Sequence, residues 1–235
     1  MVIGIIGAMD EEVALLKTKM SKLTEHKVSN IDFYLGQIEN TDVVLMKSGI
    51  GKVNAAKSTT VMHEKYSPEI IINAGSAGGL KEKHSVGDII ISSEVIHHDV
   101  DATVFDYELG QVPQMPERFS ADKTLVELVK YSSKNFNLSF DTGLIGTGDS
   151  FIGKPDQAQF IKDFFPEIVA VDMEAASIAQ ICYTYQTPFV IIRSLSDIAG
   201  KDSSISFDEF LQKASDNSAN VIIETIKNYK NKPAI

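Results

Sequence analysis

Tryptophan is absent from this sequence, cysteine occurs once, and only two of the 235 residues are arginine. The single Cys182 excludes an intramolecular disulfide and a Cys-x-x-Cys metal site. Because it lies among apolar residues at helical spacing, we expect a buried, unreactive thiol. The two arginines, Arg118 and Arg193, leave few groups for a bidentate grip on phosphate.

Positive charge is also scarce. Lys and Arg number 22 against 32 Asp and Glu, so the formal net charge is −10. Nucleic-acid binding needs clustered basic residues at the phosphates, so this balance argues against a nucleic-acid partner. No run approaches the ~20 apolar residues of a membrane span, and Met1–Ile6 lacks the basic region of a signal peptide. We therefore expect a cytoplasmic protein with no membrane partner.

Short aliphatic runs recur along the chain, and several are continuous rather than alternating, as in strands covered on both faces. The predicted strands are Val2–Ile6, Val43–Lys47, Ile70–Asn73, Asp88–Ser92, Gly143–Ile145, Ile168–Val171 and Phe189–Arg193. Helical patterns alternate with them, which indicates an α/β fold. Nothing divides the chain into parts. We expect a single domain over residues 1–235, with a mixed, largely parallel central sheet flanked by helices.

The predicted helices come from apolar residues that share one helical face. These faces are Val13, Leu16, Met20 and Leu23; Leu125, Leu128 and Val129; and Ile178, Ile181 and Cys182. A last helix is predicted from about Phe207 to about Tyr229, with Ser206 and Glu209 as its capping box.

Small or polar residues follow most of the predicted strands. The segments are Gly7–Glu12, Ser48–Gly51, Ala74–Gly79, Gly146–Phe151, Asp172–Glu174 and Ser194–Asp197. Open α/β sheets bind ligands at the carboxyl ends of their strands, and glycine lets the backbone approach a ligand closely. We expect the site to be built from these turns.

Three familiar motifs do not fit. Gly4–Met9 lacks the spacing of a dinucleotide-binding loop. Ala74–Gly79 is glycine-rich, but no Lys-Ser or Lys-Thr follows, so it is no P-loop. His97 and His98 are neighbours that point to opposite faces of a strand and have no third ligand at a recognised spacing, so a solvated or packing role is favoured and no metal is expected.

Three carboxylates fall at the same predicted sheet edge. Glu12 follows the first strand, Glu174 follows Ile168–Met173, and Asp197 ends the run from Phe189. A single such residue is usually a helix cap or dipole partner. Three together favour an active site, because carboxylates in a partly apolar pocket exchange protons near neutral pH.

The chain resembles the methylthioadenosine/S-adenosylhomocysteine nucleosidase family of the purine nucleoside phosphorylase superfamily. Seven blocks in order carry the resemblance over nearly the whole sequence: Gly4–Glu12, Lys47–Ala56, Asn73–Gly79, Asp101–Tyr107, Gly148–Ile152, Val171–Ala176 and Arg193–Asp197. It implies a nucleoside phosphorylase-like fold and hydrolysis of the N-glycosidic bond of 5′-methylthioadenosine and S-adenosylhomocysteine in methionine salvage, with no cofactor.

The resemblance also implies a role for each site residue. Glu12 is the general base toward water, and Asp197 is the general acid toward adenine N7. The implied substrate-binding residues are Ser76 and Arg193 at the water, Ser196 orienting Asp197, Glu174 and the Met173 backbone at the ribose hydroxyls, Phe151 and the Ile152 backbone at adenine, Gly78 against the nucleoside, and Met9, Ile50, Phe105 and Phe207 around the sugar and alkylthio group.

Two other functions remain open from the residues themselves. A nucleoside phosphorylase of the same superfamily would need several basic groups for phosphate, whereas the first turn offers Asp10, Glu11 and Glu12. A non-catalytic nucleoside-binding protein on the same fold would not need both an acid and a base.

The segment Asp99–Pro116 predicts a partner. It carries Phe105, Tyr107 and Met115 without helical or strand periodicity. Apolar side chains on such a loop need burial. We expect a homodimer in which Phe105 of one subunit closes the alkylthio pocket of the other.

Overall fold

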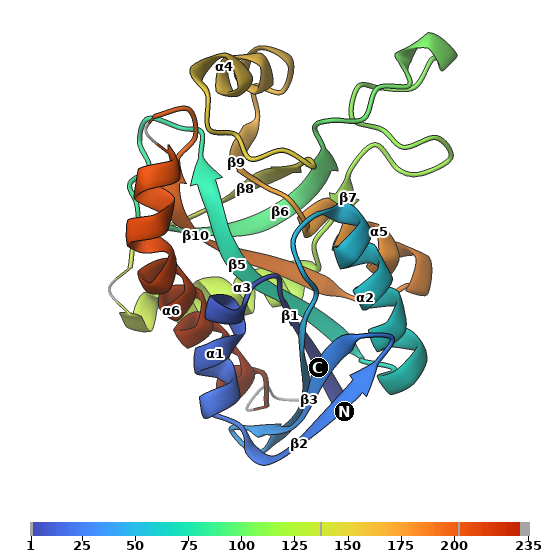
Figure 1. Cartoon of the computed structure of the whole chain (residues 1–235), viewed down its shortest axis with the longest axis vertical. Helices are drawn as coiled ribbons and strands as arrows, with labels where there is room; N and C mark the ends of the chain where they lie inside the picture. Colours follow the sequence, from blue (N-terminus) through green and yellow to red (C-terminus); the bar gives the residue numbers. More distant parts are fainter. Residues whose placement is uncertain (1, 137, 202, 231–235) are drawn as a thin grey trace.

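The computed structural model describes residues 2–136, 138–201 and 203–230 (Figure 1). Its strands are β1 (Val2–Gly7), β2 (Ser21–Val28), β3 (Ile31–Ile38), β4 (Thr41–Lys47), β5 (Ile70–Gly79), β6 (Ile89–His97), β7 (Phe119–Ser120), β8 (Phe140–Thr147), β9 (Ile168–Asp172) and β10 (Phe189–Ile198). Its helices are α1 (Asp10–Thr18), α2 (Lys52–Tyr66), α3 (Lys123–Ser133), α4 (Pro155–Phe164), α5 (Ala175–Tyr185) and α6 (Ser203–Lys230), with single 3₁₀ turns at Thr103–Phe105 and Lys134–Phe136.

The strands form one mixed sheet in the order β10-β6-β8-β9-β5-β1-β4-β3-β2, with β7 added beside β6. Parallel pairings join β1 to β4 and β5, β5 to β10, and β8 to β6 and β9. Because β10 pairs with both β6 and β5, the sheet curls back on itself at that end. The predicted α/β class with a mixed central sheet flanked by helices is confirmed.

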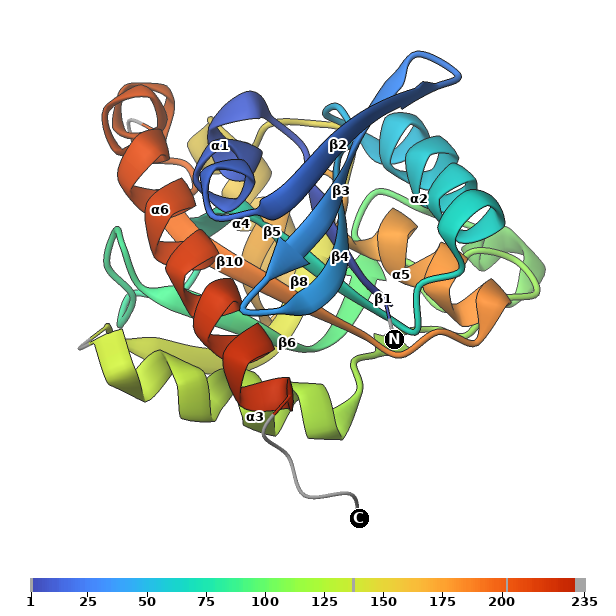
Figure 2. The ribbon, with the colours of Figure 1, turned by 90° about the horizontal axis from the view of Figure 1, so that it is seen from below.

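Helices cover the sheet on both sides. α1, α3 and α6 pack together on one side, and α2 and α5 pack together on the other (Figures 1 and 2). The strands between them are buried on both faces, as in β1, β5 and β10, which explains their unbroken aliphatic runs. Cys182 lies in this core on α5, where burial raises the pKa of its thiol.

Several predicted elements were wrong at their ends. The strands predicted to end at Asn73 and Arg193 continue to Gly79 and Ile198, so Ala74–Gly79 and Ser194–Asp197 lie in β5 and β10 rather than in turns. The helix expected through Met20 and Leu23 stops at Thr18, and Leu23 belongs to β2, a mostly exposed strand of the β2–β3 hairpin. The alternation of apolar and polar residues along β2 is weak because little of that strand is buried. The last helix begins at Ser203 rather than near Phe207, so Ser206 lies inside the helix and cannot be its cap.

Within the described part of the chain, no helix is both long and apolar enough to cross a membrane. The segment that follows β6 contains only the 3₁₀ turn Thr103–Phe105 before β7 and projects from the body of the molecule (Figure 1). The irregular structure predicted for Asp99–Pro116 is therefore present.

Candidate active site

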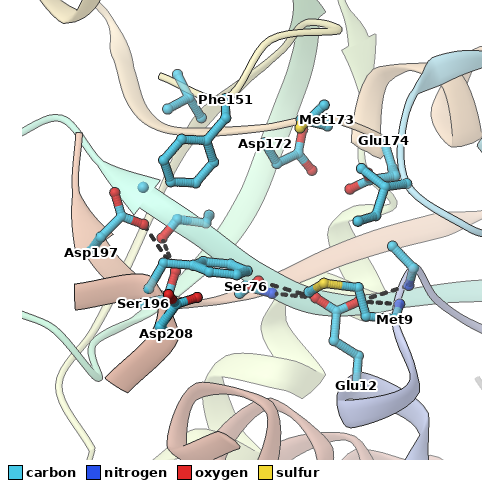
Figure 3. Close-up of a pocket in the computed structure, with 16 residues that line it drawn as sticks. Met9, Glu12, Ser76, Phe151, Asp172, Met173, Glu174, Ser196, Asp197 and Asp208 are labelled. Atoms are coloured by element: carbon cyan, nitrogen blue, oxygen red, sulfur yellow. Dashed lines mark hydrogen bonds between the residues drawn. The ribbon is translucent and has the colours of Figure 1, made fainter. Parts of the chain in front are cut away.

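A cavity of about 390 Å³ opens where strands β1, β4, β5, β8, β9 and β10 end (Figure 3). This is the sheet edge at which the sequence predicted a site. The cavity is lined by Ala8, Met9, Glu12, Ile50, Ser76, Ala77, Gly78, Phe151, Val171, Asp172, Met173, Glu174, Ser196, Asp197, Phe207 and Asp208. Eleven of the fourteen residues predicted for the site are among them: Met9, Glu12, Ile50, Ser76, Gly78, Phe151, Met173, Glu174, Ser196, Asp197 and Phe207.

Glu12 is held in the first turn of α1 by hydrogen bonds to both of its oxygens, and only 3% of the residue is exposed. Oε2 accepts from the backbone N–H of Ala8 at 2.7 Å and of Met9 at 3.3 Å. Oε1 accepts from the Ser76 backbone N–H at 2.9 Å and from the Ser76 hydroxyl at 3.1 Å. These donors fix the carboxylate at the cavity wall and join α1 to β5.

Glu174 follows β9 and faces the same cavity. Its Oε1 accepts from the Gly51 backbone N–H at 2.9 Å. Burial and the nearby Asp172 charge raise the pKa of Glu174 to about 8, against the opposing effect of Arg193.

Charged side chains bind the N-terminus of α2, where Gly51 supplies the N–H group that donates to Glu174. Asp149 accepts from the Lys52 backbone N–H at 2.7 Å, and Asp99 accepts from the Lys52 ammonium at 2.6 Å. Burial alone would raise the pKa of Asp99, but the Lys52 ammonium and the Asp149 N–H lower it on balance. The turn that holds Glu174 is thus connected to the ends of β6 and β8.

Asp197 lies at the far end of the labelled residues from Glu12 (Figure 3). It is 2% exposed, and its Oδ1 accepts from the Ser196 hydroxyl at 3.0 Å. The β10–β5 register shifts between Leu195 and Asp197, so Ser196 has no partner in that ladder. Such irregularities re-aim side chains next to active sites.

Glycine makes room opposite this carboxylate. A Cβ atom at Gly78 would lie 3.2 Å from Asp197 Oδ2 and 3.3 Å from the Ala199 Cβ, tighter than ordinary contact.

Aromatic and apolar side chains form the rest of the wall. The Phe151 and Phe207 rings meet edge to face with centroids 5.7 Å apart. Phe151 is 43% and Ile50 is 50% exposed at the mouth of the cavity. These exposed rings and chains offer apolar surface to a ligand with a flat or aliphatic part.

Three predicted site residues do not line this cavity. Ile152 lines a smaller adjoining hollow of about 30 Å³ with Phe151, Gly78 and Asp197. Arg193 is 1% exposed and lies behind the wall, paired with Asp172. Phe105 is 73% exposed on the projecting segment.

Five lining residues were not predicted: Ala8, Ala77, Val171, Asp172 and Asp208. Ala8, Ala77, Asp172 and Asp208 are each the direct sequence neighbour of a predicted residue, so their positions could have been found from the sequence. Val171 lies inside β9, two residues before Met173.

No group of three or more His, Cys, Asp or Glu residues that could hold a metal ion occurs in residues 2–136, 138–201 and 203–230. His97 and His98 are both buried, so they pack against the protein and are not solvated. His97 Nε2 contacts the Gln180 side chain at 3.0 Å.

Known proteins match this arrangement over nearly all of the chain. The family model described as "Phosphorylase superfamily" matches residues 2–227. A 5′-methylthioadenosine/S-adenosylhomocysteine nucleosidase of Oceanobacillus iheyensis is 56% identical over 227 residues, which cover 97% of this chain and 99% of that protein.

Solved structures agree. The nucleosidase of Neisseria meningitidis in complex with methylthio-immucillin-A superimposes with a TM-score of 0.95 at 43% identity, covering 97% of this chain and 99% of that one. The nucleosidase of Colwellia psychrerythraea in complex with adenine gives a TM-score of 0.94 at 44% identity, covering 96% and 94%.

Fold and site together define an enzyme of the phosphorylase superfamily. Within that superfamily, the chain belongs to the 5′-methylthioadenosine/S-adenosylhomocysteine nucleosidase family.

Proposed function

We propose that this enzyme hydrolyses the N-glycosidic bond of 5′-methylthioadenosine and S-adenosylhomocysteine, releasing adenine and the thioribose product. The observation that carries the proposal is a pair of buried carboxylates, Glu12 and Asp197, at opposite ends of one cavity. The names of the relatives at 56% and 52% identity support the choice of substrates.

Each carboxylate has a distinct task. Asp197 donates a proton to adenine N7, so that the base leaves as a neutral molecule while the C1′–N9 bond breaks. Positive charge then develops on the ribosyl ring, as in other glycoside cleavages. Glu12 takes a proton from the water that attacks C1′ from the opposite face. Ser76 orients that water, while Arg193 acts from behind the cavity wall, where its guanidinium lies across Gly75 from Glu12. No cofactor takes part.

The remaining contacts fix the substrate. Glu174 and the Met173 backbone bind the ribose 2′- and 3′-hydroxyls, and Phe151 stacks on adenine, with the Ile152 backbone at the edge of the base. Met9, Ile50 and Phe207 enclose the sugar and the alkylthio group.

Phosphorolysis fits the site less well. Among the described residues that line the cavity, none is Lys or Arg. The Arg193 guanidinium is committed to Asp172, and Arg118 forms surface pairs with Glu94, Glu117 and Glu167. Phosphate would therefore meet carboxylates without the basic groups that normally hold it.

Adenine release from methylthioadenosine, measured with and without inorganic phosphate, tests the function. Equal rates, with free methylthioribose as the product, are expected. A rate that requires phosphate would identify a phosphorylase, and binding without release would identify a non-catalytic binding protein.

Glu174→Ala is expected to weaken the binding of ribonucleosides and to affect 2′-deoxy and 3′-deoxy substrates less. A buried hydrogen bond to a charged group contributes ~1.5–3 kcal/mol, which corresponds to roughly ten- to 150-fold in KM. KM values for the ribo and deoxy substrates check this. Equal penalties on both would show that Glu174 does not read the hydroxyls.

We also propose a homodimer in which Phe105 covers the alkylthio pocket of the partner. Val104 and Phe105 are 82% and 73% exposed in the single chain, on a segment that projects from the body. Two exposed apolar side chains on a projecting turn suit an interface.

Phe105→Ala is expected to raise KM for methylthioadenosine, while Phe164→Ala, an exposed phenylalanine on α4, serves as the control. Sedimentation should show a dimer at working concentration. A fully active monomer would contradict the proposal.

A further inference from the structure

The Asp172 carboxylate, at the end of β9, has both of its oxygens engaged. Oδ2 accepts from Arg193 Nε at 2.9 Å and also from Arg193 Nη2. Oδ1 accepts from the Thr147 hydroxyl, whose oxygen in turn accepts from the Ala176 N–H at 2.9 Å. The Asp172 and Arg193 side chains are only 1% and 2% exposed. Two N–H groups of the guanidinium therefore donate to the same buried oxygen, and these charge-assisted hydrogen bonds restrain the position of Arg193.

The edge of Arg193 that Asp172 leaves free faces the catalytic carboxylate. A Cβ atom at Gly75 would lie 2.4 Å from Arg193 Nη1 and 2.8 Å from Glu12 Oε1, so these two atoms lie on either side of Gly75 and at most about 5.2 Å apart. On the other side, Arg193 Nη2 lies 3.8 Å from Glu174 Oε2. The guanidinium therefore sits between Glu12 and Glu174.

We propose that Asp172 is a positioning residue for the reaction, which holds the Arg193 guanidinium between the water-side carboxylate Glu12 and the ribose-side carboxylate Glu174. This inference rests on the proposed function. In this role Asp172 acts through Arg193, the cation that lies between the two carboxylates. A misplacement of about 1 Å in such a group costs about 10²-fold in rate.

The charges around Arg193 predict that the loss of Asp172 changes how kcat/KM depends on pH. Burial and the Asp172 charge raise the pKa of Glu174, while Arg193 and the Gly51 N–H lower it and Glu12 raises it. His97 and His98 also face Asp172, but burial lowers the pKa of each ring, so both are neutral near pH 7.

Removing the Asp172 charge takes away one group that raises the pKa of Glu174. The inflection that Glu174 contributes to kcat/KM should consequently move to lower pH.

The test compares Asp172→Asn with Thr147→Val, which removes a donor to Asp172 but keeps its charge. For Asp172→Asn we expect kcat/KM for methylthioadenosine to fall about 10²-fold and the inflection to move to lower pH. For Thr147→Val we expect a smaller fall with the inflection in place. Thermal unfolding of each variant reports the folded fraction.

Asp172→Asn within about twofold of the parent kcat/KM, or a loss without a shifted inflection, would overturn the inference. If Asp172→Asn does not fold, Thr147→Val decides: unchanged kcat/KM overturns the inference, and a fall supports it. Failure of the parent enzyme to release adenine would instead overturn the proposed function.

Discussion

Asp197→Asn is expected to bind methylthioadenosine and fail to cleave it. The asparagine amide can still form a hydrogen bond to adenine, but it has no acidic proton to give to N7. Loss of one general acid typically costs ~10²–10⁴-fold in kcat. Asp197 is suited to the role because it is buried at the cavity wall, where Ser196 donates to Oδ1 and where a Cβ atom at Gly78 would crowd Oδ2 at 3.2 Å.

A second substrate separates chemistry from structure. A nitrophenyl riboside has a good leaving group that needs no proton, so Asp197→Asn should retain much of its activity on this compound. Asp208→Asn makes the same charge change at the cavity edge and is expected to lose far less on methylthioadenosine. Equal losses of Asp197→Asn on both substrates would make Asp197 a structural residue rather than the acid.

Glu12→Gln is expected to abolish hydrolysis, with kcat lower by ~10²–10⁴-fold and nucleoside affinity largely intact. Glutamine cannot accept a proton from water. The structure adds a second consequence, because both Glu12 oxygens accept hydrogen bonds from N–H or O–H donors. In Glu12→Gln the NH₂ group takes the place of one of these oxygens, so it faces donors and loses their hydrogen bonds.

That mismatch calls for a stability control. Thermal unfolding shows whether the turn is intact, and Glu11→Gln on the exposed side of the same turn should leave kcat unchanged. Binding of adenine, measured by calorimetry, should be within a fewfold of the parent. Near-normal turnover by Glu12→Gln would remove Glu12 from the mechanism.

The seven strands predicted from continuous aliphatic runs all appear in the sheet, because a strand covered on both faces must be apolar at every position. The β2–β3 hairpin was missed for the opposite reason: β2 is mostly exposed and carries no such signal. α2 was not predicted either, since its sequence is largely polar and it buries Ser58, Thr59 and His63 along with Ala55 and Met62.

The candidate site followed from the sequence to a large extent. Residues at the carboxyl ends of neighbouring parallel strands meet at one sheet edge, which is why the sequence pattern alone groups Glu12, Ser76, Glu174 and Asp197. Ser76 and Asp197 lie within the last residues of β5 and β10 rather than in turns after them. Phe105 was expected at the pocket of a partner and is exposed in the single chain, so its role remains a prediction.

By itself, the sequence determined the fold class, the sheet edge that carries the site and the acidic character of that site. Each of these depends on local pattern: apolar runs, the turns that follow them and the charge of the residues in those turns. Only the tertiary structure decided how the charges are paired. Arg193 was expected at the water, yet its guanidinium lies behind the wall, bound to Asp172 from β9 and facing Glu12 from α1 and Glu174. Such pairing depends on which strands are neighbours and on the space that a glycine such as Gly75 leaves between them. Neither can be predicted from the sequence pattern of a single segment.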